Sequence, residues 1–316
     1  MTETKKDFID LSQFNKNELI FLIEDGINKK NISSKNGMAS VDEDACAKDK
    51  ILATIFEKPS TRTRFSFETA MYQLGGKTIY ANMSDMQLGR GETIEDTAKV
   101  ISRYVDIAVF RTNKHSTLES FAKNASIPVI NGLTNKSHPC QVLADLITVK
   151  EHIGDIENKS YVWFGPANNM LTSWIHAAQI IGFELRICSP KDYSVENNLV
   201  SCFPNIIIDL DPNDAAKDCD CIITDTWFSM GEEDNDQKRK ILEPFKVDVK
   251  KISMASSNAL FLHCLPAHRG EEVDAEVIDG INSVVWDEAE NRVHAQKSAI
   301  RSVSYTHLTL PTTLTV

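Results

Sequence analysis

The sequence predicts an α/β protein with two doubly wound domains, each a mostly parallel sheet flanked by helices. Short apolar runs alternate with amphipathic stretches along the chain, which is typical of parallel strands joined by helices. A length of 316 residues exceeds what one small core needs and suits two domains. Hydrophobic residues make up 42% and charged residues 25%, so the composition is globular rather than disordered.

In the first half of the chain, a buried strand is expected over 48–56, followed by a helix over 65–76 that ends at a Gly-Gly pair. The further elements expected here are a strand at 77–81, a helix with an acidic first turn at 93–105, a strand at 106–110, a helix at 116–125, a short strand at 128–131 and a long helix at 138–154. We expect the long helix to connect the two domains, with residues 1–148 forming the first.

The pattern restarts after this helix, and residues 149–289 are expected to form the second domain. A helix is expected at 168–182, with further helical stretches between some of the strands. The expected strands lie at 160–165, 184–189, 205–209, 220–225, 259–265 and 283–287.

Charge and cysteine content narrow the class of partner and the compartment. The formal net charge of −11 argues against a general binder of nucleic acid or anionic membrane. No stretch approaches the roughly 20 apolar residues of a membrane span, and the polar start MTETKKDFID is unlike a signal peptide. Seven cysteines without framework or zinc-site spacing predict a reduced, cytoplasmic chain.

A phosphate site is predicted directly after the first strand, since ligands of parallel sheets bind beyond the carboxyl ends of strands. Residues Ser60, Thr61, Arg62 and Thr63 stand at the start of a helix, where backbone N–H groups lack partners and the helix dipole attracts anions. Arg62 and Arg64 add positive charge in a fork that matches phosphate oxygens. One of the two arginines could instead be structural, paired with an acid such as Glu57 or Glu68; the sequence leaves this open.

Five ordered motifs resemble the aspartate/ornithine carbamoyltransferase family over nearly the whole chain, to about Gln296. They are FEKPSTRTRFSFE (56–68), MQLGRGETIEDTAKVISRYVD (86–106), SHPCQVLADL (137–146), DTWFSMG (225–231) and HCLPAHRG (263–270). The resemblance implies carbamoyl transfer from carbamoyl phosphate to an amine, with no metal or organic cofactor. It also implies a homotrimer or a multiple of one.

The family's contacts to carbamoyl phosphate map onto matching positions of this chain. By resemblance, Ser60 to Thr63 bind the phosphate, Arg111 and His138 contact the carbonyl oxygen, and Gln141 contacts the amino group. Gln87 and Arg292 are further contacts by resemblance, although an exposed loop residue is an equal reading of Gln87. His138 precedes Pro139 at a helix start, where the dipole favours a neutral imidazole.

The acceptor side favours L-ornithine, with L-citrulline and phosphate as products. By resemblance, its contacts are Asn169, Asp225, Ser229, Met230, Cys264 and Leu265. Asp225 suits an α-ammonium group, and the thiol or thiolate of Cys264 suits the δ-amine. Arg62, Arg111, His138 and Cys264 are expected to carry catalysis.

Plainer readings exist for several of these residues. His138 or Asp225 alone would more often be a helix cap, and Cys264 a small buried hydrophobe; only the motif context favours function. Transfer to putrescine or an acylated ornithine, and a non-catalytic relative, are the competing functions. No G-x-G-x-x-G follows any strand, which argues against a dinucleotide-binding protein.

The sequence departs from the family pattern in two places. Residues 165–169 read GPANN, which keeps the Asn pair but lacks the usual acidic residue and one glycine. The family's C-terminal helix, matched near 290–301 and expected to join the first domain, is followed by the Thr-rich tail 302–316, which lacks an apolar helical stripe. We expect this tail to be non-native sequence.

Overall fold

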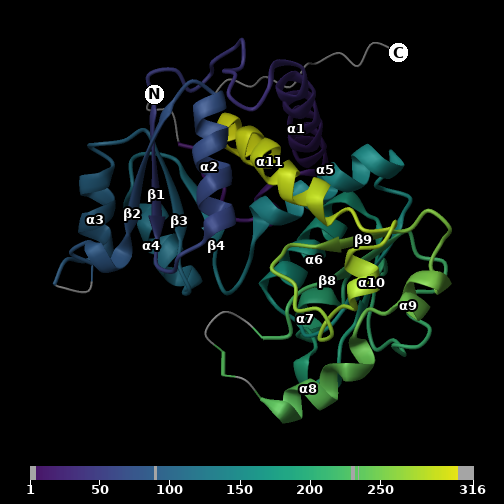
Figure 1. The fold of residues 1–316 in the computed structure, drawn as a ribbon. Coiled ribbons are helices and arrows are strands. Elements are labelled where there is room, and N and C mark those ends of the chain that lie inside the picture. The colour runs from purple at the N-terminus through teal and green to yellow at the C-terminus, as the bar shows by residue number, and fades with distance from the viewer. Residues whose placement is uncertain (1–4, 89–90, 229–231, 234, 305–316) are drawn as a thin grey trace. The chain divides into compact units, whose positions relative to one another are not determined.

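The computed structural model describes residues 5–88, 91–228, 232–233 and 235–304 (Figure 1). The chain divides into two compact units. The first comprises Met1–Gln13, Ile20–Asn135 and Val293–Val316, and the second comprises Phe14–Leu19 and Lys136–Arg292. Within the described ranges, no helix has the length and apolar character that a membrane crossing requires.

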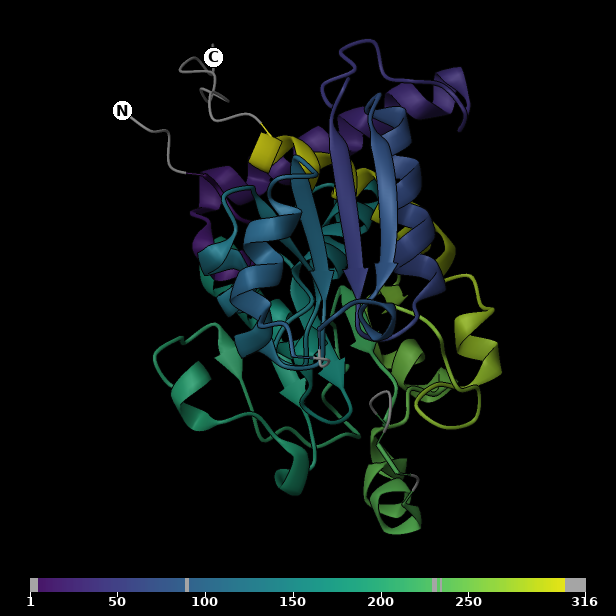
Figure 2. The same ribbon diagram turned by 90° about the vertical axis from the view of Figure 1, so that its left-hand side faces the viewer.

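The first unit is built on a four-stranded parallel sheet in the order β2-β1-β3-β4. Its strands are β1 (Ile51–Phe56), β2 (Lys77–Asn82), β3 (Ile107–Arg111) and β4 (Val129–Leu133). Figure 2 shows these strands pointing the same way. Phe56 is level with both Asn82 and Arg111, so neighbouring strands end side by side and the residues that follow them share one edge of the sheet.

Helices cover both faces of this sheet, and Figure 1 shows α2 and α3 on opposite sides of it. They are α1 (Lys16–Asn36), α2 (Thr61–Gln73), α3 (Ile94–Ile101), α4 (His115–Asn124) and the last part of α11 (Val285–Ser304), with short 3₁₀ turns at Leu11–Gln13 and Met83–Asp85. Strands β1 and β3 bury Ile55 and Phe110 against α3 and α4, where Phe110 stacks on Phe121 at 4.6 Å between ring centroids.

The second unit has a five-stranded parallel sheet in the order β7-β6-β5-β8-β9. Its strands are β5 (Ser160–Phe164), β6 (Glu184–Cys188), β7 (Ile206–Ile207), β8 (Cys221–Thr224) and β9 (Leu260–His263). Thr224 pairs with both Phe164 and His263 in the strand register, so the segments that follow β5, β8 and β9 start at one edge.

Helices again pack on this sheet, and an aromatic cluster of Tyr161, Trp174 and Phe183 fills part of the core. The helices are α5 (Pro139–Ile153), α6 (Asn169–Ile181), α7 (Asn197–Val200), α8 (Asp236–Leu242), α9 (Val249–Met254), α10 (Ala275–Ile278) and the start of α11, with 3₁₀ turns at Lys191–Tyr193 and Glu243–Phe245. On the strands, Phe164, Ile222 and Phe261 belong to one buried apolar cluster with Val247 and Val285.

The predicted fold class is confirmed, and most predicted elements lie within a few residues of those observed. The helix predicted over 65–76 starts earlier, at Thr61, and ends before Gly75, whose φ of 84° suits glycine. The strand predicted at 283–287 is wrong. Ser283 forms only an isolated bridge with Phe261, and α11 begins at Val285. Its apolar run leads into the first turn of a helix, with Val284 and Val285 buried and Trp286 exposed, and a short strand can share this pattern.

Two expectations about chain organisation remain untested. The predicted domain boundary follows residue 148, whereas the two compact units divide between residues 135 and 136. The predicted boundary stays a prediction. Residues 302–304 continue α11 with Ser302 and Val303 buried, and 305–316 lie outside the described residues. That the tail is non-native therefore stays a prediction.

A buried ion pair fastens the end of α11 within the first unit. The ammonium of Lys297 is fully buried and lies 2.8 Å from Asp42 Oδ1, and it also donates to Ser33 Oγ and Gln73 Oε1 at 3.1 and 3.0 Å. Burial lowers the pKa of Lys297, since water no longer solvates its charge. Of these three acceptors only Asp42 is a carboxylate, and its charge offsets the cost of burying the ammonium.

We predict that Asp42→Ala lowers the free energy of unfolding by about 3–5 kcal/mol, because it leaves the ammonium of Lys297 buried without its carboxylate. The matched control is Asp96→Ala, since Asp96 is 61% exposed in its pair with Lys99 and its loss costs less than about 1 kcal/mol. Urea unfolding of both variants measures the difference. Equal destabilisation would show that the buried pair has no special weight.

Candidate active site

The predicted phosphate loop lies between β1 and α2 in the first unit. Ser60 is the N-cap residue, but its side chain does not cap the helix and contacts Thr63 Oγ1 at 3.0 Å instead. A hydrogen bond from Arg64 N to Ser60 O closes the first turn of the helix at 3.1 Å, so the N–H groups of the residues before Arg64 lie at the open N-terminal end. The first turn contains no acid. This helix end therefore keeps its positive partial charge for an anion.

Arg111 is brought to this loop by the strand register. It ends β3, is 5% exposed, and its Nη1 donates to Thr63 Oγ1 at 3.1 Å. Glu57 follows β1 at the same edge and accepts hydrogen bonds from the Thr112 hydroxyl and the Asn113 N–H, both at 2.6 Å. Although burial acts to raise it, these hydrogen bonds lower the pKa of Glu57. The acid is thus held by β3's end and does not pair with either arginine of the loop.

Arg64 is the arginine of the loop that pairs with an acid, and that acid is Glu68. Arg64 Nε lies 2.8 Å from Glu68 Oε1, and the guanidinium of Arg64 stacks 4.0 Å from the ring centroid of Tyr80. Both contacts fix Arg64 along the side of α2. Arg62 is exposed at the helix start, where its charge remains available to a ligand.

In the second unit, α5 begins at the predicted histidine. His138 is the N-cap residue and Pro139 occupies the first helical position, as expected. The N–H of His138 donates to Ser173 Oγ at 2.9 Å, which ties this helix start to α6. Gln141 follows in the first turn, is 1% exposed, and accepts a hydrogen bond from Arg292 Nη1 on α11.

Two buried carboxyls hold the other end of the Gln141 amide. Its Nε2 donates to Asp145 Oδ1 at 2.8 Å and to Glu288 Oε1 at 3.0 Å. Each acid is 1% exposed. Burial, followed by the neighbouring Asp145, raises the pKa of Glu288 well above its ordinary value, and burial raises that of Asp145 to about 7. The sequence analysis missed both acids. The available signal was an acid inside the apolar run QVLADLIT and another just before ENR.

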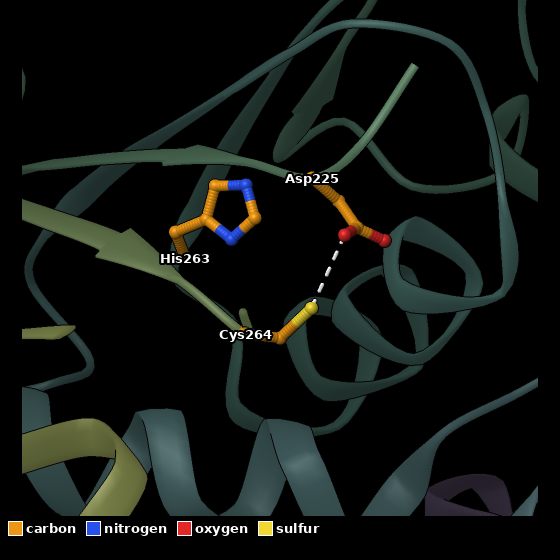
Figure 3. A group of neighbouring side chains, drawn as sticks. All are labelled: Asp225, His263 and Cys264. Atoms are coloured by element: carbon orange, nitrogen blue, oxygen red, sulfur yellow. Dashed lines mark hydrogen bonds between the residues drawn. The ribbon is translucent and has the colours of Figure 1, made fainter. Parts of the chain in front are cut away.

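Asp225 and Cys264 meet at the ends of β8 and β9 (Figure 3). Cys264 Sγ donates to Asp225 Oδ1 at 3.2 Å. Asp225 Oδ1 also accepts from the Thr226 N–H at 2.8 Å, and Oδ2 accepts from Asn168 Nδ2 at 2.8 Å. Burial, and then the adjacent Asp225 carboxylate, raise the pKa of the Cys264 thiol well above its ordinary value. The two forms that the sequence left open therefore reduce to the neutral thiol.

His263 orients the segment that carries Cys264. Its Nδ1 accepts from the Leu265 N–H at 2.9 Å, and its Nε2 lies 3.2 Å from Glu272 Oε1. Asp225, His263 and Cys264 each place a potential ligand atom within 4.8 Å of the others. Because both ring nitrogens of His263 already have hydrogen-bond partners, the group forms a hydrogen-bonded network rather than a ready set of metal ligands.

The remaining predicted residues are placed as follows. Asn169 is the first residue of α6, and its neighbour Asn168, which the sequence analysis did not select, is the N-cap residue that accepts from the N–H groups of Met170 and Leu171. Asn168 thus links a helix start to Asp225. Gln87 is exposed, and Leu265 is partly buried with φ 57°. Ser229 and Met230 lie outside the described residues.

These features define a class: an α/β protein of two parallel-sheet units, with a helix start that has no acid in its first turn in the first unit and hydrogen-bonded acids at the strand ends of the second. The comparisons specify the family. Its carbamoyl-phosphate-binding domain matches residues 6–151, and its aspartate/ornithine-binding domain matches residues 157–303. The chain belongs to the aspartate/ornithine carbamoyltransferase family.

Several relatives match most of the chain in sequence and structure. The ornithine carbamoyltransferase of Caulobacter vibrioides is 49% identical over 93% of this chain and 96% of its own length. The crystal structure of ornithine carbamoyltransferase from Burkholderia thailandensis matches with a TM-score of 0.85 at 44% identity, covering 94% of this chain and 98% of that one. The Pyrococcus furiosus enzyme matches with a TM-score of 0.87 at 42% identity, covering 95% and 97%.

We predict that Asp225→Asn lowers the pKa of the Cys264 thiol, because it removes the negative charge that disfavours the thiolate beside it. Iodoacetamide should therefore alkylate Cys264 faster in the variant at a fixed pH near 8, read by mass spectrometry of the cysteine peptides. The exposed Cys202 serves as internal control, with an unchanged rate. A slower reaction at Cys264 in the variant would contradict this electrostatic account.

Proposed function

We propose that this chain transfers the carbamoyl group of carbamoyl phosphate to the δ-amine of L-ornithine, giving L-citrulline and phosphate. One observation carries the choice of acceptor: the hydrogen-bonded pair of Asp225 and Cys264 at adjacent strand ends. A carboxylate held by three donors suits an ammonium group, and a neutral thiol beside it suits an amine that must lose its proton before it attacks. The relatives named ornithine carbamoyltransferase support this choice.

The donor's phosphate is assigned to the start of α2. The positive end of the α2 dipole, the exposed guanidinium of Arg62 and the buried guanidinium of Arg111 all favour a dianion. As the C–O bond to phosphate breaks, these donors stabilise the leaving dianion. The chemistry calls for no metal or organic cofactor, since carbamoyl phosphate is already activated.

The carbamoyl group is assigned to Arg111, His138, Gln141 and Arg292. Attack by the amine places negative charge on the carbonyl oxygen, and a preorganised donor there contributes roughly 3–4 kcal/mol to the transition state. His138 is the proposed second donor, and its N-cap position favours the neutral imidazole. The Oε1 of Gln141 is the proposed acceptor for the carbamoyl N–H. Asn169, Leu265, Ser229, Met230 and Gln87 remain proposed substrate contacts.

We further propose a homotrimer, or a multiple of one, working in arginine biosynthesis in the cytoplasm. Exposed apolar side chains support self-association. Phe65 and Tyr72 on α2 are 67% and 54% exposed, and Ile79 on the edge strand β2 is 51% exposed. All seven cysteines are free, which is typical of a reducing compartment.

The proposed function is tested by measuring the carbamoylated product formed from each of four acceptors. The purified chain with carbamoyl phosphate should turn over ornithine, and not putrescine, aspartate or N-acetylornithine, because only ornithine offers both a free α-amino-acid group and a free δ-amine. Product identity is read by mass spectrometry. Turnover of another acceptor in place of ornithine would overturn the roles given to Asp225 and Cys264 while leaving the phosphate site intact.

We predict that Arg62→Ala weakens carbamoyl phosphate binding by about 100-fold, since it removes a charged partner of the phosphate worth roughly 3 kcal/mol. Arg64→Ala is the matched control from the same helix turn, and its effect should stay within a few-fold because Arg64 is engaged with Glu68 and Tyr80. Equilibrium binding of carbamoyl phosphate to both variants gives the comparison. The reverse order of effects would exchange the two roles.

A further inference from the structure

The Gln141 amide has a single orientation in the second unit. A primary amide has two N–H donors, and the Nε2 of Gln141 gives hydrogen bonds to Asp145 at 2.8 Å and to Glu288 at 3.0 Å. The Oε1 is then the group left to face Arg292 and any ligand beside it. Were the amide turned over, its oxygen would meet two carboxyl oxygens, and its N–H groups would meet a guanidinium.

Ionising both of the carboxyls that fix this orientation would cost a large free energy. Asp145 and Glu288 are each 1% exposed, and a hydrogen bond joins their side chains. Two buried carboxylates in contact repel each other, so one proton stays between them. Glu288 has the more strongly raised pKa of the two and donates the shared proton to Asp145. In that state the pair carries one negative charge and can still accept both N–H groups of Gln141.

Glu288 also reaches the acceptor side of the second unit. Its Oε2 accepts the backbone N–H of His263 at 2.9 Å, one residue before Cys264. One carboxyl on α11 therefore hydrogen-bonds both Gln141 on α5 and the end of β9. The groups that face the pair are Gln141 from α5, Trp174 from α6, Arg292 from α11, and Cys264 with the His263 N–H from β9.

We propose that Asp145 and Glu288 are positioning residues for carbamoyl transfer: a buried carboxyl pair that shares one proton, turns the Gln141 oxygen toward the carbamoyl amino group, and holds the backbone that presents Cys264. The inference rests on the proposed function, in which Gln141 accepts a hydrogen bond from that amino group. Neither acid touches substrate. Their effect on the reaction passes through Gln141 and the end of β9.

Two substitutions at Asp145 separate positioning from simple core stability. In Asp145→Asn, the amide oxygen can accept from Gln141 and the amide N–H can donate to Glu288, which then ionises, so the hydrogen bonds and the single charge are kept. In Asp145→Ala, the hydrogen bonds of Asp145 to Gln141 and Glu288 are lost, and Nε2 of Gln141 keeps only its bond to Glu288. We expect kcat with ornithine to fall about 100-fold in the Ala variant and to stay within about 5-fold of the unchanged chain in the Asn variant, with the KM for ornithine changed little in both.

Thr148→Val is the matched structural control. Thr148 lies one turn further along α5, is fully buried, and exchanges hydrogen bonds with Ala144 O and Asn291. Its loss should lower the melting temperature as Asp145→Ala does, and leave kcat unchanged. If Asp145→Ala lowers only the melting temperature, or if Asn fails to restore kcat while the fold is intact, the positioning role is wrong.

The shared proton has its own readout, which needs no turnover. Between pH 4, near which both carboxyls of the unfolded chain lose their protons, and about 7, the folded pair binds more protons than the unfolded chain, so its contribution to stability falls as pH rises through that window. Asn at position 145 removes this term. The melting temperature of Asp145→Asn relative to the unchanged chain should therefore rise between pH 5 and pH 8 by at least about 2 °C. A constant difference would overturn the shared proton.

These readouts also separate the inference from the proposed function. Turnover of ornithine by the unchanged chain, with kcat equal in Asp145→Ala, would overturn the positioning role and leave the function standing. Turnover of a different acceptor, with kcat falling in Asp145→Ala and recovering in Asp145→Asn, would overturn the choice of ornithine and support the positioning role.

Discussion

Burial of the carboxyl groups of Asp145, Asp225 and Glu288 is the constraint on which the second unit depends. Each of these buried acids must accept hydrogen bonds or share a proton, and either arrangement fixes the position of the groups that bond to it. Asp225 takes the first course, with donors from Asn168, Thr226 and Cys264. Asp145 and Glu288 take the second, and thereby set the orientation of the Gln141 amide. The geometry of the site follows from neutralising these acids more than from the shape of the sheet.

The first unit has the same parallel-sheet architecture but collects positive rather than negative charge at its strand ends. Its strand ends gather positive potential, from a helix start that lacks an acid and from Arg111, which the register places level with Phe56. The nearby acid, Glu57, accepts hydrogen bonds from Thr112 and Asn113. A parallel sheet only brings loops to one edge. The residues in those loops decide whether an anion or a cation binds there.

Sequence reasoning predicted what depends on local pattern and missed what depends on pairing. The fold class, the loop from Ser60 and the N-cap position of His138 follow from apolar periodicity and helix-start chemistry, which neighbours along the chain determine. Asp145 and Glu288 are 143 positions apart and look like ordinary helix residues until the fold joins them. The strand predicted at 283–287 was wrong for a related reason: a short apolar run does not reveal whether tertiary packing will make it a strand or a helix start.

The sign of the charge around Cys264 gives a physical reason for the kind of acceptor that suits this unit. The thiol is flanked by Asp225, and its pKa is raised further by Glu288 and Asp145. An acceptor with a side-chain carboxylate would add negative charge to this surrounding and would be repelled. An acceptor with two amino groups is attracted while protonated. In the proposed function, the same field that attracts the ammonium form also opposes its deprotonation, so the amine would give up its proton within the site. The neutral thiol can accept a hydrogen bond from that amine without adding another charge.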